Sequence, residues 1–236
     1  MVRLRHSLRA LAALAMTAAL LSDAQSSLGV EVHMRLAIAK NAARRTAPPA
    51  VLWLMPLQKT PPAPFPPGQK YTLMQKNRTF KPHLLVVPVG SVVQFPNADP
   101  FFHNVFSLFD GKRFDLGLYE AGSTKSVTFS REGISYIFCN IHPEMSAVVI
   151  ALSTSIYDIG DSRGIFHVSD VPPGDYEMHV WIEGVAQPAL NSMTRRVHLT
   201  SNSGDLGTIE VPANELNSKA HTNMYDQPYD RDVKPY

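Results

Sequence analysis

Residues 133–152 read GISYIFCNIHPEMSAVVIAL, and this stretch decides the fold class. Two apolar runs rich in β-branched and aromatic residues, at 134–139 and 147–152, flank a short segment that contains Pro143. Runs of this length and composition, bounded by turn residues, are typical of β-strands. The stretch therefore predicts two consecutive strands joined by a tight turn.

Similar short patterns precede this stretch. They lie at 83–89, 91–95, 104–108 and 125–129, and they are separated by turns such as Gly90 and Arg131–Gly133. Regularly spaced short strands with glycine and proline turns favour a β-sandwich or barrel. Residues 70–152 are therefore predicted to form a Greek-key β-sandwich, and the fold class is all-β.

A second set of strand patterns follows at 164–169, 175–183, 195–200 and 206–211. The run 175–183 alternates cleanly: Tyr176, Met178, Val180 and Ile182 lie on one face, and Glu177, His179, Trp181 and Glu183 on the other. Residues 153–212 are thus predicted to be a second, smaller β-sandwich, and the polar tail 213–236 to be disordered.

Residues 25–69 carry two further strand patterns, at 30–38 and 50–57, and a proline-rich stretch at 60–68. The proline-rich composition favours a stiff, extended linker. The two strands can pair with the C-terminal sandwich, which would make the central unit an insertion.

The N-terminus has the pattern of a targeting segment. Arg3, Arg5 and Arg9 precede a short apolar run at 11–21, and small residues follow at 22–24. This is typical of a secretory signal peptide covering residues 1–24. The run is too short to span a bilayer, and no later segment is long and apolar enough. We expect a periplasmic or secreted protein without an integral membrane span.

Charge and motifs exclude several function classes. The formal net charge is +2, and the first 24 residues contribute all of it. A near-neutral mature chain offers no electrostatic basis for binding nucleic acid. The sequence also lacks the nucleophile elbow, the P-loop, the metalloprotease helix motif and the dinucleotide-binding fingerprint. We therefore expect a protein that is not an enzyme.

The single cysteine, Cys139, lies beside other soft or nitrogen donors. In an exported chain it can be a buried inert thiol, half of an intermolecular disulfide or a metal-bound thiolate. His142 and Met145 follow it within the same turn, and His103 follows a turn-like stretch at 96–100. In an antiparallel sandwich these two turns can lie side by side.

Two imidazoles and a thiolate with a weak thioether on the axis suit copper, which cycles between two oxidation states. Zinc fits less well, because a thioether is a poor zinc ligand and structural zinc sites prefer more cysteines. The predicted metal ligands are therefore His103, Cys139, His142 and Met145. The strand histidines have no such surroundings in the sequence and are predicted to be structural: His33, His83, His167, His179 and His198.

Residues 78–152 resemble the cupredoxins, the blue copper proteins of the plastocyanin and amicyanin group. The spacing Cys139-x-x-His142-Pro143-x-Met145 is similar to the short ligand loop of amicyanin, and His103-Asn104-Val105 is similar to the upstream ligand of plastocyanin. The resemblance implies one type 1 copper ion. It also implies that Asn104 ties the two ligand loops together and hydrogen-bonds near the thiolate.

The C-terminal unit resembles a carboxypeptidase-regulatory-like or transthyretin-like β-sandwich. The residues that carry this resemblance are Gly164-x-Phe166, Val171-Pro172-Pro173-Gly174-x-Tyr176 and Val180-Trp181. Similar exported bacterial proteins carry labels such as plastocyanin-like or methylamine-utilisation protein.

These patterns predict a one-electron carrier between redox partner proteins. His142 is the ligand expected to have an edge near solvent, and Phe101, Phe102 and Pro143 are the expected apolar docking patch around it. Two alternatives stay open at this point. One is a periplasmic copper carrier or chaperone, and the other is a cell-surface module that binds glycan or protein.

Overall fold

A computed structural model describes residues 29–38, 46–58, 64–108, 111–212, 216, 222–225 and 227 of the 236-residue chain. The predicted signal peptide, residues 60–63 of the proline-rich stretch and most of the predicted tail lie outside the described residues. Among the described residues, no helix has the length and apolar character needed to cross a bilayer.

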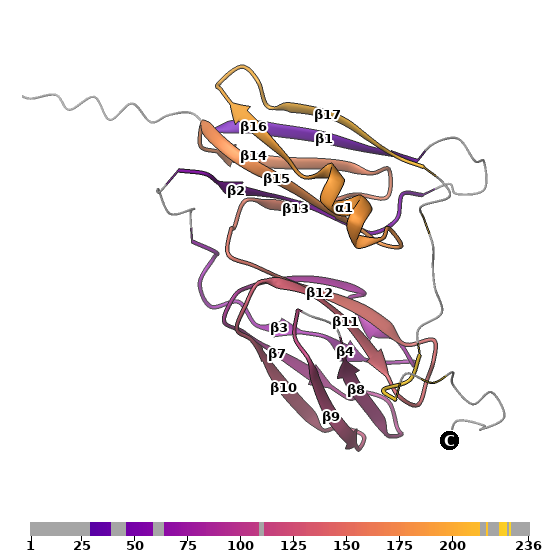
Figure 1. Cartoon of the computed structure of the whole chain (residues 1–236). Coiled ribbons are helices and arrows are strands. Elements are labelled where there is room, and N and C mark those ends of the chain that lie inside the picture. The colour runs from indigo at the N-terminus through magenta and orange to yellow at the C-terminus, as the bar shows by residue number, and fades with distance from the viewer. Residues whose placement is uncertain are drawn as a thin grey trace, which may run out of the picture.

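The described strands form two stacked β-sandwiches, and the all-β prediction is confirmed (Figure 1). In the upper sandwich, one sheet has the order β14 (Ile165–Val171), β1 (Val30–Ile38), β17 (Asp205–Val211). The facing sheet has the order β13 (Tyr157–Ile159), β2 (Ala50–Pro56), β15 (Gly174–Ile182), β16 (Arg195–Leu199). Helix α1 (Gln187–Met193), with Pro188 in its first turn, connects β15 to β16.

The lower sandwich contains residues 133–152. Its larger sheet has the order β6 (Leu84–Pro88), β12 (Ser146–Leu152), β11 (Gly133–Cys139), β8 (His103–Ser107), β9 (Phe114–Tyr119). The facing sheet has the order β10 (Thr124–Phe129), β7 (Ser91–Pro96), β3 (Tyr71–Thr72). A two-stranded ribbon of β4 (Met74–Gln75) and β5 (Phe80–Lys81) lies alongside.

The two N-terminal strands pair with C-terminal strands. β1 lies between β14 and β17, with Met34 opposite Phe166, and β2 lies between β13 and β15, with Trp53 opposite His179. Along β1 the apolar residues are buried and the polar ones exposed, as expected for a strand with one face on a core. The lower sandwich, in sequence, therefore lies between β2 and β13.

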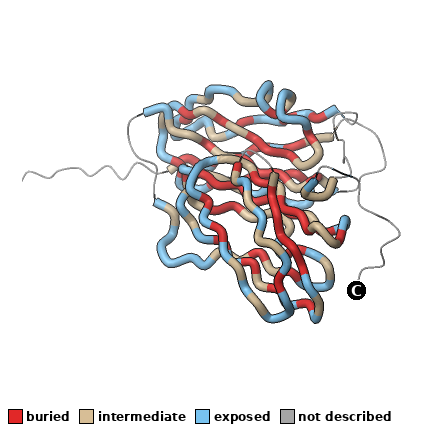
Figure 2. Tube along the Cα trace, turned by 60° about the horizontal axis from the view of Figure 1, so that its bottom comes forward, coloured by how far each residue is buried: buried red, intermediate tan, exposed pale blue. Residues whose placement is uncertain are grey.

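Strand β12 is buried on both faces, which explains why its sequence is continuously apolar rather than alternating. Ala147, Val149 and Ala151 belong to the core of the lower sandwich. Val148, Ile150 and Leu152 belong to the core cluster that continues into the upper sandwich. Buried residues accordingly run through the body of the molecule in Figure 2, and exposed residues lie mainly along its periphery.

Polar contacts also cross the junction between the sandwiches. The indole Nε1–H of Trp181 on β15 donates to the hydroxyl of Tyr136 on β11 at 3.2 Å. Nε2 of His83 lies 2.6 Å from a carboxylate oxygen of Glu183. Trp181 is fully buried, although the alternation along β15 placed it on the polar face. The reason is that the face of β15 that carries Trp181 packs on the lower sandwich instead of facing water.

Part of the C-terminal segment is placed on the body of the molecule. Leu216 packs against the core cluster that the two sandwiches share, and the backbone N–H of Met224 donates to the side-chain oxygen of Asn140 at 3.0 Å. The sequence predicted disorder from 213 to 236, and the composition of the tail carries no signal for these two contacts.

Candidate metal centre

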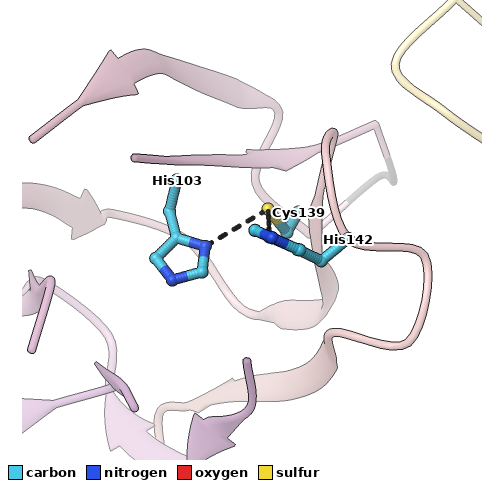
Figure 3. Close-up of side chains that lie close together, drawn as sticks. All are labelled: His103, Cys139 and His142. Carbon is cyan, nitrogen blue, oxygen red and sulfur yellow. Dashed lines mark hydrogen bonds between the residues drawn. The ribbon is translucent and has the colours of Figure 1, made fainter. Parts of the chain in front are cut away.

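The side chains of His103, Cys139 and His142 meet at one end of the lower sandwich (Figure 3). Nδ1 of His103 lies 3.7 Å from the sulfur of Cys139, and Nδ1 of His142 lies 3.6 Å from the same sulfur. The three side chains are 0%, 0% and 2% exposed, respectively. Among the described residues, no other three His, Cys, Asp or Glu side chains bring potential ligand atoms within 4.8 Å of one another.

Strand pairing explains how residues 36 positions apart in sequence come together. β8 and β11 are antiparallel neighbours, with Cys139 opposite Val105. His103 begins β8 and Cys139 ends β11, so both residues lie at the same end of the sheet. His142 belongs to the turn that leads from β11 into β12, and this turn folds back over that end.

Backbone hydrogen bonds hold the turn. The N–H of Cys139 donates to the carbonyl of Met145 at 3.3 Å, and the N–H of Met145 donates to the carbonyl of His142 at 3.0 Å. Met145 is fully buried in the same core cluster as Cys139. Its position in the turn agrees with a place beside the centre, and its role as an axial ligand stays a prediction.

Asn104 ties the two ligand loops together through its backbone. Its carbonyl accepts the N–H of Asn140 at 3.1 Å, and its own N–H stabilises the thiolate of Cys139. The side chain points elsewhere: its Nδ2 donates to Asp115 at 2.6 Å, and its Oδ1 has no hydrogen-bond partner among the residues that the structure describes. The resemblance assigned a linking role to Asn104; here the peptide group, and not the amide side chain, makes the link.

Asp99 is a residue of the site that the sequence analysis missed. One of its carboxylate oxygens lies 2.9 Å from Nε2 of His103, and the side chain is only 4% exposed. The backbone N–H groups of Asn77 and Arg78 donate to Asp99 at 2.6 and 3.0 Å. A carboxylate on Nε2 keeps the proton there, so that Nδ1 presents its lone pair toward the sulfur of Cys139.

The electrostatics of the centre favour neutral imidazoles. Burial lowers the pKa of His103, although the hydrogen bond to Asp99 acts in the opposite direction. Burial and the neighbouring His103 lower the pKa of His142. Burial of Asp99 would raise its pKa, but hydrogen bonds from Arg78, His103 and Asn77 bring it below its usual value. Neutral imidazoles beside a carboxylate are the forms that accept a metal ion.

Two opposing effects act on the pKa of the Cys139 thiol. Burial raises its pKa, which favours the protonated thiol in the absence of a cation. The backbone N–H groups of Asn104, Ile141 and His142 lower it, since they donate toward the sulfur. A cation in the centre would shift this balance to the thiolate, the form that binds metal.

An aromatic side chain covers the two imidazoles. The ring centroid of Phe101 lies 5.3 Å from that of His103 and 5.5 Å from that of His142, and the guanidinium of Arg78 lies 5.3 Å from the Phe101 centroid. His142 was expected to have an edge near solvent, but it is 2% exposed. The sequence could not show this, because Phe101 reaches His142 only through the fold.

A shallow groove lies next to the centre. Its volume is about 500 Å³, and it is lined by Phe102, Asn104, Asp115, Gly117, Leu118, Asn140, Ile141, Met224 and Tyr225. Phe102 and Leu118 are 55% and 62% exposed. Of the expected docking patch, Phe102 and Pro143 are thus exposed, whereas Phe101 is half-buried over the imidazoles.

The separations between donor atoms fit a metal ion. Bonds of about 2.3 Å to sulfur and about 2.0–2.1 Å to nitrogen, spread by roughly 110–120°, hold the sulfur and a nitrogen about 3.6–3.8 Å apart. The two observed sulfur–nitrogen distances are 3.7 and 3.6 Å. The donor set of one thiolate and two imidazoles, in a buried β framework, suits copper.

Comparison with known proteins finds similarity only among solved structures. No protein-family model matches the chain, and no curated protein matches it significantly. Among solved structures, a purple cupredoxin from Nitrosopumilus maritimus is 23% identical over 35% of this chain and 100% of its own, with a TM-score of 0.32. An amicyanin variant in the Cu(I) state is 20% identical over 35% of this chain and 82% of its own, with a TM-score of 0.34.

A copper-containing nitrite reductase from Thermus scotoductus is 20% identical over 50% of this chain and 28% of its own, with a TM-score of 0.34. Since each of these matches covers half of this chain or less, the assignment of a metal rests on the side chains described above.

Proposed function

We propose that this protein binds one copper ion as a type 1 centre and works as an exported one-electron carrier. The observation that carries the proposal is the convergence of Nδ1 of His103 and Nδ1 of His142 on the buried sulfur of Cys139, at 3.7 and 3.6 Å. Bound copper would supply one-electron redox chemistry between its cuprous and cupric states.

Each side chain has a distinct role in this proposal. Cys139 provides the thiolate, and the imidazoles of His103 and His142 provide nitrogen donors that accept both oxidation states. Asp99 orients His103 and holds its proton on Nε2, 2.9 Å away. Met145 is the proposed axial thioether, which would tune the reduction potential.

Burial of the ligands favours an electron carrier over the alternatives. Inner-sphere catalysis needs a coordination position that a substrate can reach, whereas Phe101 covers both imidazoles and the three ligands are at most 2% exposed. Ready delivery of the ion to another protein likewise needs accessible ligands. Electron transfer needs neither an open coordination position nor accessible ligands, since the electron can pass through the surrounding side chains to a partner protein at the surface.

The proposed docking surface for redox partners is the exposed apolar surface next to Phe101. Phe102 and Leu118 are 55% and 62% exposed, and they line the groove next to the centre. A small apolar contact suits a transient complex between electron-transfer proteins. The proposed location in the periplasm or outside the cell rests on the targeting pattern at residues 1–24.

We further propose that the upper sandwich is of the carboxypeptidase-regulatory-like type. The turn at 171–174 and the strand after it support this, because the hydroxyl of Tyr176 donates back to the carbonyl of Pro172 at 2.7 Å. That bond holds the entry into β15, the strand that carries Trp181 to the junction.

The decisive experiment is a visible and EPR spectrum of the copper-loaded mature protein. A thiolate–copper centre gives an intense visible band that bleaches reversibly on reduction, and Cys139→Ser should abolish that band while the fold, measured by circular dichroism, persists. A Cys139→Ser protein as strongly coloured as the wild type would overturn the assignment. Rapid loss of copper to an apo-acceptor would favour the copper carrier, and failure to take up copper would leave the binding module.

A further inference from the structure

A pair of histidines faces solvent on the outer sheet of the upper sandwich, far in sequence from the buried centre. His33 on β1 and His167 on β14 lie directly opposite each other across the antiparallel pair. Their rings are stacked, with centroids 4.6 Å apart and planes inclined by 5°. Both side chains are on the exposed face of the sheet, because Val32, Met34 and Phe166 occupy the buried face.

Carboxylates flank this imidazole pair. Glu31, two residues before His33 on the same face, lies 2.6 Å from Nε2 of His167. On the other side of β1, Asp205 of β17 is the register partner of His33 and is also exposed. His167 on β14, His33 on β1 and Asp205 on β17 therefore form one row across three adjacent strands. The carboxylate of Glu31 contacts the imidazole of His167.

We propose that Glu31, His33 and His167 form a surface site for a divalent transition-metal ion of the zinc or copper type. Cβ atoms directly opposite each other on antiparallel strands are about 4.5–5.5 Å apart. Two ligand nitrogens on one tetrahedral ion, with bonds of about 2.0–2.1 Å, lie roughly 3.3 Å apart. Rotation of two exposed imidazoles about their side-chain bonds closes the remaining gap without movement of the backbone.

The surroundings define which ions fit. Imidazole nitrogen is a preferred donor for zinc and copper, while calcium and magnesium prefer an all-oxygen shell. The carboxylate of Glu31 supplies negative charge, and Asp205 adds to it from the next strand. Arg35, one row further along β1, is the nearest opposing charge on this face in the register.

The ligand atoms of this cluster are less closely gathered than those of the buried centre. Among the described residues, only the buried group already has all its ligand atoms within 4.8 Å of one another. The backbone nevertheless presents the surface pair in register, and a hydrogen bond from the N–H of His167 to Asp158, at 2.8 Å, holds that strand in place. Such a site would bind an exchangeable ion, with water or another ligand completing the shell.

The test is a calorimetric titration of the full chain with Zn²⁺, in a Cys139→Ser background that weakens the buried centre. We expect a zinc-binding event that His33→Gln and His167→Gln each weaken by about tenfold or more, since loss of a direct ligand should cost at least as much as loss of a supporting partner, which is about 10–100-fold. Glu31→Gln should weaken it less, because the imidazole pair remains.

His198→Gln is the matched control. His198 is exposed, and its cross-strand partner is a carboxylate, Asp175, whose oxygen lies 2.7 Å from Nδ1. Because this control removes an imidazole from an imidazole–carboxylate pair, it should leave the zinc affinity unchanged. Equal affinity in wild type, His33→Gln and His167→Gln would overturn the proposal, and so would an equal loss in His198→Gln. The outcome is independent of whether the buried centre holds copper.

Discussion

The contact between Asp99 and His103 makes a sharp prediction: Asp99→Asn should weaken copper binding while leaving the chain folded. In the native protein the carboxylate oxygen Oδ2 faces two donors, Nε2–H of His103 at 2.9 Å and the N–H of Arg78 at 3.0 Å. The other oxygen accepts the N–H of Asn77 at 2.6 Å. An asparagine has one acceptor oxygen, so one side of the group becomes a donor.

Either orientation of the new amide weakens the support of His103. With the amide oxygen at the position of Oδ2, the bonds from His103 and Arg78 remain, but the N–H₂ then faces the N–H of Asn77, and the negative charge behind the imidazole is gone. With the amide reversed, Nε2 must accept a hydrogen bond, and the ring proton moves to Nδ1, the nitrogen that faces the sulfur. Loss of such a supporting partner typically costs about 10–100-fold in metal affinity. This corresponds to roughly 1.4–2.7 kcal/mol. The upper part of that range is expected here, because the carboxylate is only 4% exposed.

The assay is competition for Cu(I) against a chromophoric chelator, with unfolding of the metal-free protein in urea measured in parallel. Asp115→Asn is the control: it makes the same chemical change at the same end of the sandwich. There, a single oxygen, Oδ1, accepts both from Asn104 and from Gly117, so an asparagine can keep both bonds, whereas at position 99 donors face both oxygens and one of them is the ligand imidazole. Asp99→Asn with wild-type affinity, or an equal loss in Asp115→Asn, would refute the reasoning.

Three further outcomes are expected. Met145→Leu should retain copper but shift its reduction potential, measured by voltammetry, and an unchanged potential would contradict an axial role. Trp181→Phe should lower the free energy of unfolding by at least about 1 kcal/mol, since it removes the hydrogen bond to Tyr136 and part of a fully buried ring; a urea titration that gives no change would count against both contacts. The hydrogen bond to Glu183 raises the pKa of His83 against the effect of burial, so this pair stabilises the fold fully below about pH 6.5 and less as pH rises through the raised value. Because both side chains are more than a third exposed, His83→Gln should cost less than about 1 kcal/mol, and it should cost more at pH 6 than at pH 9; the opposite trend would be inconsistent with this pairing.

The strands and the donor set could be predicted because their signals are local. Residues 134–139 and 147–152 alternate or run apolar over lengths typical of strands, and the structure places β11 and β12 there. Cys139, His142 and Met145 lie within one turn, so their proximity follows from spacing alone. His103 required the further step that the ends of two antiparallel strands meet, and β8 and β11 do so.

Other features arise only from tertiary contacts, and no local pattern could reveal them. Asp99 lies in the predicted turn at 96–100, but only the fold shows that its carboxylate contacts His103. The short strands β3, β4, β5 and β13 have two or three residues each, too few for a periodic signal. β9 runs through Gly117, whose φ of 63° accompanies a register shift against β8.

The junction between the sandwiches bears directly on the proposed electron transfer. The turn that carries His142 connects β11 and β12. The outer faces of both strands pack on the upper sandwich through Tyr136, Val148 and Ile150. A strand fixed on both faces leaves little freedom for the turn at its end, because packed interiors do not deform continuously. In the proposed copper protein, the upper sandwich would therefore restrict movement of the ligands when copper changed its oxidation state. Loosening the junction should thus slow electron self-exchange in the copper-loaded protein, even where the ligands themselves are untouched.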